Sequence, residues 1–385
     1  SFGGYAGNDS FRTGYAVGGG MRTKRLRVGS MGFIAPLYHP LRLAEEIALV
    51  DQMLGGRFEC GLVPGISAGF FKPFGIDYNF RKSPTFEFVN YLRAAYGDQQ
   101  PFSFHGENHK TESALLAVQP LQKPHPPLWM MSRDPATLEF CSREGINTGY
   151  FINVPRHEAG PRYQKFLTDW SAAGHGRKPN IAYSTVVYVD ETDQKAIENG
   201  LFRASRAYEG LLPLAGPGET FEDRLARQKQ RFIDRGEIGV SNVVTNLFNP
   251  DFIMEHELVF VGSPETVAKK LRKAAEIGFF NTFMGEFNFA DLPEADLMRS
   301  IRLFGEKVLP ALRGYEASAW AGLFAPGGQP PEQLARLVAD GVLPANGGLA
   351  RVSKGVMSLR NTTASPSLTA VSHIAIATGS NSVDN

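Results

Sequence analysis

The segment from residue 26 to residue 65 constrains the fold of this chain more than any other. It contains an apolar run at 26–35, an amphipathic pattern that begins at Pro40 and stops at Gly55, and a second short apolar run at 58–63. This order predicts a strand, a helix, a tight glycine stop and a strand. The two strands must be parallel because a helix connects them. In folds of this kind, functional residues lie where the strands end.

The strands and the helix of this unit carry further signals. Residues 28–35 are apolar or small at every position, which is typical of a parallel strand covered on both faces. Pro40 suits the first helical position, where its missing N–H costs nothing. The apolar stripe expected to face the sheet is Leu41, Ala44, Ile47, Ala48 and Met53. The helix residues expected to face water are Arg42, Glu45, Glu46 and Asp51.

The rest of the chain continues the alternation of strands and helices, which predicts an α/β fold with a parallel sheet. Further strands are predicted at 128–131, 146–152, 181–189 and 279–287. Helices are predicted at 80–96, 135–144, 159–173, 192–210, 264–277 and 293–312, with a hairpin at 101–119. Residues 211–256 interrupt the rhythm, with a charged helix followed by a loop around Asn246 to Pro250. A long insertion is more often functional than idle, so we expect it to cover a pocket.

Composition narrows the class of protein. Of the 385 residues 43% are hydrophobic, and the net charge is +1 with no basic block, so neither a nucleic acid nor a membrane surface is expected as a partner. The two cysteines, Cys60 and Cys141, form no disulfide framework and fit buried packing in a reducing compartment. No stretch approaches ~18 uninterrupted apolar residues. These features predict a cytoplasmic protein.

The end of the chain differs from the rest in composition. Residues 325–385 contain no Phe, Tyr or Trp, and Ser, Thr, Ala, Gly and Asn dominate. Such a stretch buries too little apolar surface to offset the entropy of ordering it. We therefore predict a folded domain over 1–313 and a largely flexible tail over 314–385, with a short helix after Pro331 as the exception.

Three blocks, at 28–58, 120–129 (PLQKPHPPLW) and 261–267 (VGSPETV), together resemble the bacterial-luciferase-like flavin monooxygenases. The resemblance implies a (β/α)8 barrel of the TIM type, with the insertion placed before the last strand. It also implies that the barrel begins with two strands, the second ending in a Glu-His-His type motif. Ser1 begins a segment similar to the one just after that motif, so we expect an N-terminally incomplete chain that lacks these two strands. The open strand edges would then be a liability for folding.

The strongest local chemistry comes directly after the strand at 128–131, at Ser132, Arg133 and Asp134. Asp134 suits the N-cap of the next helix, whose unpaired N–H groups form a ready anion site, and Arg133 adds a cation with several donors. The residues alone also fit a plain capped helix with a surface arginine. The resemblance favours the phosphate of a flavin at this turn, with Thr137 as a further contact. Asp134 must then use its charge for capping.

The resemblance implies further flavin contacts at Ser30, Met31, Val63 and Ile66. Ordinary packing inside a barrel explains the first two equally well. Pro64 stands where the luciferases themselves have an arginine, so a second phosphate contact is not expected. An apolar substrate pocket is predicted from aromatic residues near strand ends, although aromatic residues are more often core. Its walls would be Phe70, Phe71, Trp129 and Phe151.

Two other motifs, one of serine hydrolases and one of zinc helices, match the sequence only in part. Residues 65–69 match the Gly-x-Ser-x-Gly elbow of serine hydrolases, with Ser67 as nucleophile, but that motif leads directly into a helix and residues 70–75 are not expected to start one. The pairs at 157–158 and 256–257 lack the second histidine of a zinc helix, so no metal site is expected.

The resulting functional hypothesis is a flavin-dependent monooxygenase. By the resemblance it would take reduced FMN from a separate flavin reductase and use oxygen to oxygenate an apolar organic substrate. Three alternatives remain open: a deazaflavin-dependent oxidoreductase of the same fold, a non-catalytic flavin-binding protein, and a serine hydrolase acting through Ser67. The sequence identifies no catalytic base, and a homo-oligomer is compatible with it.

Overall fold

An eight-stranded sheet forms the centre of the computed structural model, which describes residues 9–65, 68–209, 212, 216–318, 320 and 373–377. The strand order is β1-β2-β5-β6-β7-β9-β10, and β8 lies off this path and pairs with β7. The strands are β1 (Val28–Ile34), β2 (Phe58–Val63), β5 (Leu128–Met131), β6 (Asn147–Phe151), β7 (Ile181–Val189), β8 (Phe260–Gly262), β9 (Thr282–Glu286) and β10 (His373–Ala377). All neighbours pair in parallel except β10, which runs antiparallel to β9.

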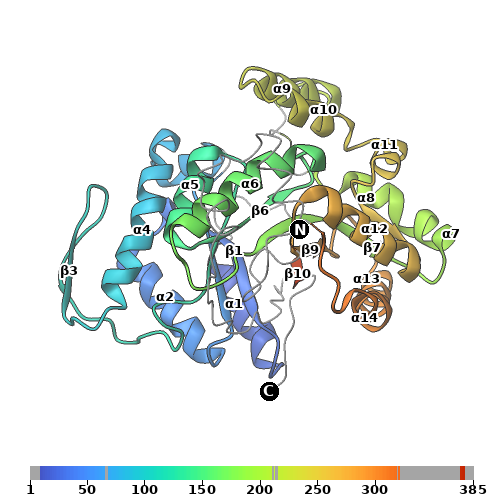
Figure 1. The fold of residues 1–385 in the computed structure, drawn as a ribbon. Helices are drawn as coiled ribbons and strands as arrows, with labels where there is room; N and C mark the ends of the chain where they lie inside the picture. The colour runs from blue at the N-terminus through green and yellow to red at the C-terminus, as the bar shows by residue number, and fades with distance from the viewer. Residues whose placement is uncertain are drawn as a thin grey trace.

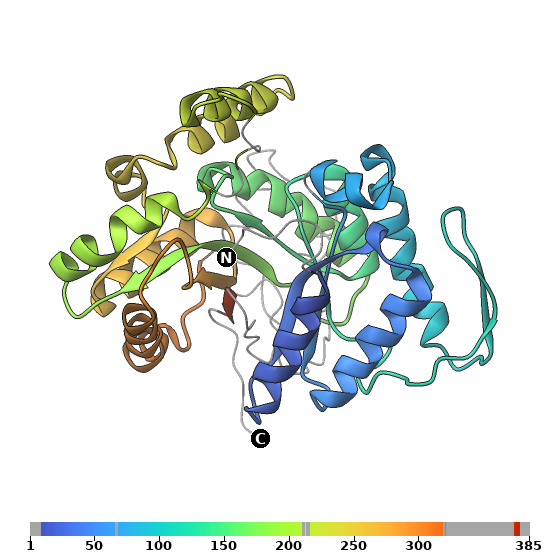
Figure 2. The ribbon, with the colours of Figure 1, turned by 180° about the vertical axis from the view of Figure 1, so that it is seen from behind.

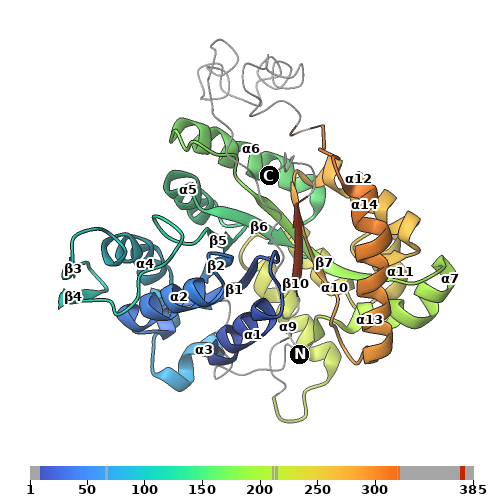
Figure 3. The ribbon, with the colours of Figure 1, turned by 90° about the horizontal axis from the view of Figure 1, so that it is seen from below.

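The sheet curls as a half-barrel with helices around its outside (Figures 1 and 3). The helices before the insertion are α1 (Asp9–Met21), α2 (Pro40–Met53), α3 (Ala68–Phe71), α4 (Lys82–Ala95), α5 (Pro135–Glu144), α6 (Arg156–Ala172), α7 (Asp193–Ala196) and α8 (Phe202–Arg206). Those after it are α12 (Pro264–Gly278), α13 (Glu294–Leu303) and α14 (Leu309–Leu312). Helix α1 packs beside α2 and β1 (Figure 2).

Short helical segments of other types complete the set of elements. They are η1 (Ala35–Leu37), η2 (Lys72–Phe74), η3 (Tyr78–Phe80) and the π-helical segments η4 (Ile197–Leu201) and η6 (Phe304–Val308). The predicted hairpin is present as β3 (Phe102–His105) and β4 (Lys110–Ala114), paired with each other. The sequence prediction is confirmed for β1, β2, β5, β6, β7 and β9 and for the helices α2, α4, α5, α6, α12 and α13. The strands β8 and β10 and the helix α3 were not expected.

The main apolar core fills the space between the sheet and the helices on its convex side. It includes Phe33, Phe58 and Phe283 from the strands and Leu43 and Leu271 from the helices, all fully or almost fully buried. Both cysteines are buried, as predicted, and burial raises the pKa of the Cys60 and Cys141 thiols far above the ordinary value. The core thus holds the strands that define the concave face.

One part of the prediction for α2 is wrong. Asp51 was expected to face water but has no exposed surface, while Met53, expected in the apolar stripe, is 45% exposed. The carboxylate of Asp51 accepts hydrogen bonds from the backbone N–H (2.8 Å) and the side-chain amide (2.7 Å) of Gln122. Asp51 lies seven residues after Ala44, on the buried side of the helix, and this partner from a distant segment compensates for its burial.

The insertion is helical over most of its described length. It contains α9 (Phe221–Ile233), α10 (Ile238–Asn246) and α11 (Pro250–Glu255), and the loop predicted around Asn246 to Pro250 is only a short link between the last two. Helices α9 and α10 share a small apolar core of Phe232, Val240 and Val244. They stand at the end of the molecule in Figure 1, above α6 and β6. Val243 and Leu247 join this unit to a second core near the end of β7.

Two described parts of the predicted tail contact the barrel. Trp320 is 1% exposed and packs against Phe279, and β10 lies along β9 in the register His373 to Glu286 and Ala377 to Thr282. The short helix predicted after Pro331 lies outside the described residues. So does Ser67, but the expectation that no helix comes after it is wrong, because the one-turn helix α3 begins at Ala68.

Candidate functional site

A small apolar cluster lines the concave face of the half-barrel. Trp129, Met131, Ala182 and Met284 are buried together, and Met31 packs against them. All five belong to strands, and their sequence neighbours Met130, Tyr183 and Phe283 belong to the main core between the sheet and the helices, so the cluster lies on the opposite face. A Cβ on Gly149 would lie 2.8 Å from both the Met131 Sδ and the Ala182 Cβ, and the bare backbone there leaves room for these side chains. We call these five residues the barrel floor.

The indole of Trp129 is held in place by the buried ion pair of Glu59 and Arg27. Its Nε1 donates to the Glu59 carboxylate (2.7 Å), and the other oxygen of Glu59 accepts from Arg27 Nε (2.5 Å). Glu59 is 5% exposed. Because the indole N–H is satisfied, the ring of Trp129, which is 1% exposed, makes only apolar contacts within the barrel floor. Arg27 and Glu59 were not identified from the sequence, in which they lie 32 residues apart.

The turn after β5 has the capping geometry that the sequence predicts. The Asp134 Oδ2 accepts from the backbone N–H (3.0 Å) and the hydroxyl (2.7 Å) of Thr137, and it forms an ion pair with Lys82 Nζ at 2.9 Å. Burial alone would raise the pKa of Asp134, but the Lys82 ammonium and the Thr137 donors outweigh it and lower the pKa. The charge of Asp134 is therefore used inside the turn.

Arg133, next to this cap, is held by the insertion. Its Nη2 donates to Glu237 Oε2 at 2.6 Å, and its guanidinium lies 5.6 Å from the ring centroid of Phe232. Its Nε is buried and has no hydrogen-bond partner. Arg162 donates to the backbone oxygen of Arg133 (3.0 Å), which fixes the turn. The guanidinium therefore already holds one oxyanion and keeps a further donor, a chemistry that fits a phosphate.

The remaining predicted contacts occupy different surroundings. Ser30 is 6% exposed with an unpartnered hydroxyl, Ser132 accepts from the Asp134 N–H through its hydroxyl, and Val63 is half-buried at the end of β2. Ile66 lies outside the described residues. Met31, Ser132, Arg133, Asp134 and Thr137 thus fall on the concave face or at the carboxyl end of β5, where the prediction placed the flavin.

The four aromatic residues predicted to wall a pocket do not lie in a single cluster. Trp129 belongs to the barrel floor, whereas Phe71 is fully buried and packs edge-on against Tyr78. Phe70 is half-buried in α3. Phe151, the last residue of β6, is 40% exposed and lies opposite Ser184 in the parallel register. Phe151 alone among these four therefore offers open aromatic surface at a strand end.

A buried carboxylate at the end of β9 was not identified from the sequence. Glu286 is 2% exposed and accepts from Ser184 Oγ (3.2 Å) and from the Tyr208 hydroxyl (3.1 Å). Burial and the nearby Glu286 raise the pKa of Tyr208 well above its ordinary value, so the phenol remains a donor. These contacts join the segment after α8 to β7 and β9. No sequence signal connects three residues so far apart in the chain.

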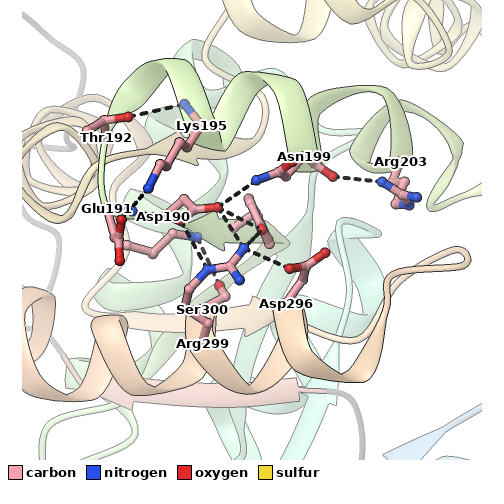
Figure 4. A network of polar contacts seen from close by, with 11 residues as sticks. Asp190, Glu191, Thr192, Lys195, Asn199, Arg203, Asp296, Arg299 and Ser300 are labelled. Carbon is pink, nitrogen blue, oxygen red and sulfur yellow. Dashed lines mark hydrogen bonds and ion pairs between the residues drawn. The ribbon is translucent and has the colours of Figure 1, made fainter.

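A second polar network lies after β7 (Figure 4). Arg299 of α13 donates to both oxygens of Asp190, through Nη2 at 2.8 Å and Nε at 3.1 Å, and it also pairs with Asp296. Asn199 and Tyr188 donate to the same carboxylate. Burial would raise the pKa of Asp190, but Arg299 and the other donors lower it to about 2. These contacts connect α13 to the end of β7.

Neither a metal centre nor a membrane-spanning helix is found over the part of the chain that the structure describes. That part contains no cluster of three or more His, Cys, Asp or Glu side chains able to hold a metal ion. None of its helices is long and apolar enough to cross a membrane. An open surface pocket of about 500 Å³ lies outside the barrel, between α4, α5 and the hairpin, with Phe86 and Phe140 stacked in its lining.

Comparison with known proteins gives the same fold and a family. Residues 17–280 match the model of the luciferase-like monooxygenases. The oxygenase component of flavin-dependent trigonelline monooxygenase from Acinetobacter baylyi is 27% identical over 46% of this chain and 49% of its own length. The FMNH2-dependent dimethylsulfone monooxygenase of Pseudomonas putida is 24% identical over 76% of each chain. The chain thus spans about half the length of the first of these relatives.

Solved structures share the architecture at low identity. Monooxygenase RslO1 from Streptomyces bottropensis superposes with a TM-score of 0.60 at 21% identity, covering 78% of this chain and 82% of that one. The coenzyme F420-dependent tetrahydromethanopterin reductase of Methanopyrus kandleri gives 0.56 at 19% identity, covering 78% and 87%. The match over most of the described barrel, together with the parallel half-barrel itself, shows that this chain belongs to the luciferase-like monooxygenase family.

Proposed function

We propose that this chain is the oxygenase of a two-component system, which takes reduced FMN from a separate reductase and uses oxygen to oxygenate an apolar organic substrate. Family membership and the FMNH2-dependent relative support this function. The observation that carries it is Arg133, which lies at the start of α5, holds an oxyanion and keeps a buried Nε donor. An arginine in this state is suited to a phosphate ester.

Each part of the site has a defined task in this proposal. Arg133 binds the phosphate, while Lys82 neutralises Asp134 and Thr137 donates a hydrogen bond to it, so that the charge of Asp134 opposes the dianion less. The barrel floor supplies an apolar surface that excludes water. Bound reduced FMN would supply the redox chemistry with oxygen, and the protein would supply binding and orientation.

The phosphate contact is tested by comparing two flavins that differ only in that group. Arg133→Ala should weaken the binding of FMN by about 10-fold or more, because it removes a charge-assisted contact, and leave riboflavin binding unchanged. Arg143→Ala is the matched control, since this arginine lies at the other end of α5 with an exposed side chain. Binding is measured by quenching of flavin fluorescence. Equal FMN affinity in the wild type and Arg133→Ala would remove the anchor from the proposal.

A deazaflavin-dependent oxidoreductase is the second candidate, because an F420-dependent enzyme shares this fold. Such an enzyme transfers hydride and consumes no oxygen. Anaerobically reduced FMN and reduced F420 are each mixed with the protein, oxygen is admitted, and its uptake with candidate apolar substrates is measured. Because reduced FMN consumes oxygen even without an enzyme, the oxygenated product is also measured, and product formed with FMN supports the oxygenase. Oxidation of F420 without oxygen uptake supports the deazaflavin enzyme, and stoichiometric flavin binding with no product supports a non-catalytic flavin-binding protein.

A further inference from the structure

The contact between Arg133 and Glu237 joins two parts of the chain that the sequence separates by 104 residues. Arg133 belongs to the turn after β5, and Glu237 precedes α10 in the insertion. The distance from Arg133 Nη2 to Glu237 Oε2 is 2.6 Å. The side chain of Arg133 is 25% exposed and that of Glu237 is 31% exposed. This is a close, partly desolvated pair at the place where an anion is expected to bind.

Glu237 stands at the start of α10, but its carboxylate does not cap that helix. It is the N-cap residue of α10, a position at which the shorter side chains of Asp, Asn, Ser and Thr commonly accept from the first N–H groups of the helix. In this structure Glu237 makes no such bond, and its backbone torsions (φ −91°, ψ 59°) are not those of a usual cap. The carboxylate instead reaches across to the barrel. The side chain of Glu237 therefore leaves the start of α10 uncapped and pairs with Arg133 instead.

The insertion helices α9 and α10 make two further contacts near Arg133. Phe232, from the last turn of α9, lies against the guanidinium. Gly239 comes so close to α6 that a Cβ there would meet the carboxylate of Glu158 at 2.3 Å, and Glu158 itself lies 3.7 Å from Arg162. The start of α10 is thus placed over the anion site by contacts with the turn before α5 and with α6. Two carboxylates therefore lie here: Glu158 lies near Arg162, and Glu237 is the one that pairs with Arg133 itself.

We propose that Glu237 is a built-in competitor for the anion site: its carboxylate holds Arg133 in the ligand-free protein, and the phosphate of an incoming ligand must displace it. The inference rests on the proposed role of Arg133 as phosphate anchor. Binding then exchanges one oxyanion for another on the same guanidinium, and it releases the start of α10 from the barrel. Ligand affinity and the attachment of the insertion are therefore coupled.

The first test removes the competing charge. Glu237→Gln should tighten the binding of FMN and of inorganic phosphate about fivefold, the effect expected from losing a partly exposed ion pair, and leave riboflavin unchanged. Asp234→Asn is the matched control, because this exposed carboxylate lies three residues away and pairs only with Gln230 among the described contacts. Tightening for FMN but not for inorganic phosphate would also support displacement, and would identify the flavin phosphate as the competing group.

The second test monitors the insertion without any turnover. In hydrogen–deuterium exchange, saturating phosphate should speed exchange of the amides at the start of α10 in the wild type and in Asp234→Asn. The same amides should exchange fast in Glu237→Gln even without phosphate. If Arg133→Ala weakens FMN but Glu237→Gln neither tightens it nor alters exchange, the anchor stands and the competitor is wrong. If Arg133→Ala leaves FMN affinity unchanged, the anchor itself fails, and the competitor with it.

Discussion

At the scale of single residues, Asp190 shows how one buried carboxylate can hold several elements. It is 1% exposed and collects Arg299, Asn199 and Tyr188 as donors. Asp190→Asn keeps the size but loses the charge, and should lower the free energy of unfolding by about 2 kcal/mol, the cost of weakening hydrogen bonds to a charged group. Urea denaturation measures this loss. A change within experimental error would show that the network does not stabilise the fold.

The same residue predicts a pH dependence. Its pKa in the folded protein is about 2, below the ordinary value for an aspartate, so its contribution is complete above the unfolded pKa of about 4 and is lost as the pH falls toward 2. The difference in unfolding free energy between the wild type and Asp190→Asn should therefore shrink between about pH 4 and pH 2. A difference that stayed constant over this range would contradict the assignment.

Residue-scale prediction from sequence succeeded where a signal is local. Asp134 caps α5 as expected because an N-cap acts on a neighbour three residues away. The role of Arg133, which follows the same strand, stays a prediction. Glu237 could not be found, since nothing near it in the sequence refers to Arg133. Asp51 was misassigned because its charge was read without the distant Gln122 that satisfies it.

At the scale of elements, strands and helices with strong periodicity were predictable, and short ones were not. β8 has three residues, and β10 lies in a stretch whose composition predicted mobility. The helical insertion shows a related limit. Its helices α10 and α11 are short, and Asn249, which looks like a loop residue, in fact accepts from two N–H groups at the start of α11.

The helix α12 permits a direct test of how an element is fixed. Ser263 is its N-cap and accepts from the Thr266 N–H, while Asp193 of α7 accepts from the Ser263 N–H (2.6 Å) and the Thr266 hydroxyl (2.9 Å). Asp193→Ala removes both links between the helices and should destabilise the protein by about 1 kcal/mol. Thermal unfolding should show a lowered midpoint. An unchanged midpoint would mean that the core alone positions α12.

At the scale of the whole molecule, the strands within the described residues form an open sheet. β1 forms one edge, and β10 covers the edge of β9 in the antiparallel sense, where a closed barrel would have a parallel neighbour. Open edges were expected from the resemblance, but the antiparallel β10 was not, because periodicity describes each strand and not which edges meet. Exposed edges promote association between chains, so we expect β10 to limit pairing at the β9 side, although β10 is itself the last strand of the sheet.

Breaking the pairing of β10 tests that expectation. Proline at both Ile374 and Ala375 must remove an N–H that points to β9, since alternate N–H groups of an edge strand face the neighbour. The double variant should self-associate more strongly than the wild type in light scattering. Ile374→Val with Ala375→Ser keeps both N–H groups and serves as control. Equal scattering by all three proteins would show that β10 does not protect the edge.

The two buried thiols can report how the molecule unfolds. Cys60 lies in β2 and Cys141 in α5, on separate elements of one core, and burial keeps both protonated and out of reach of water-soluble reagents. An alkylating reagent can therefore modify them only after the chain opens. The two labelling rates, read separately by mass spectrometry, would coincide if the half-barrel unfolds as one unit, and would differ if the strand side and the helix side come apart in turn.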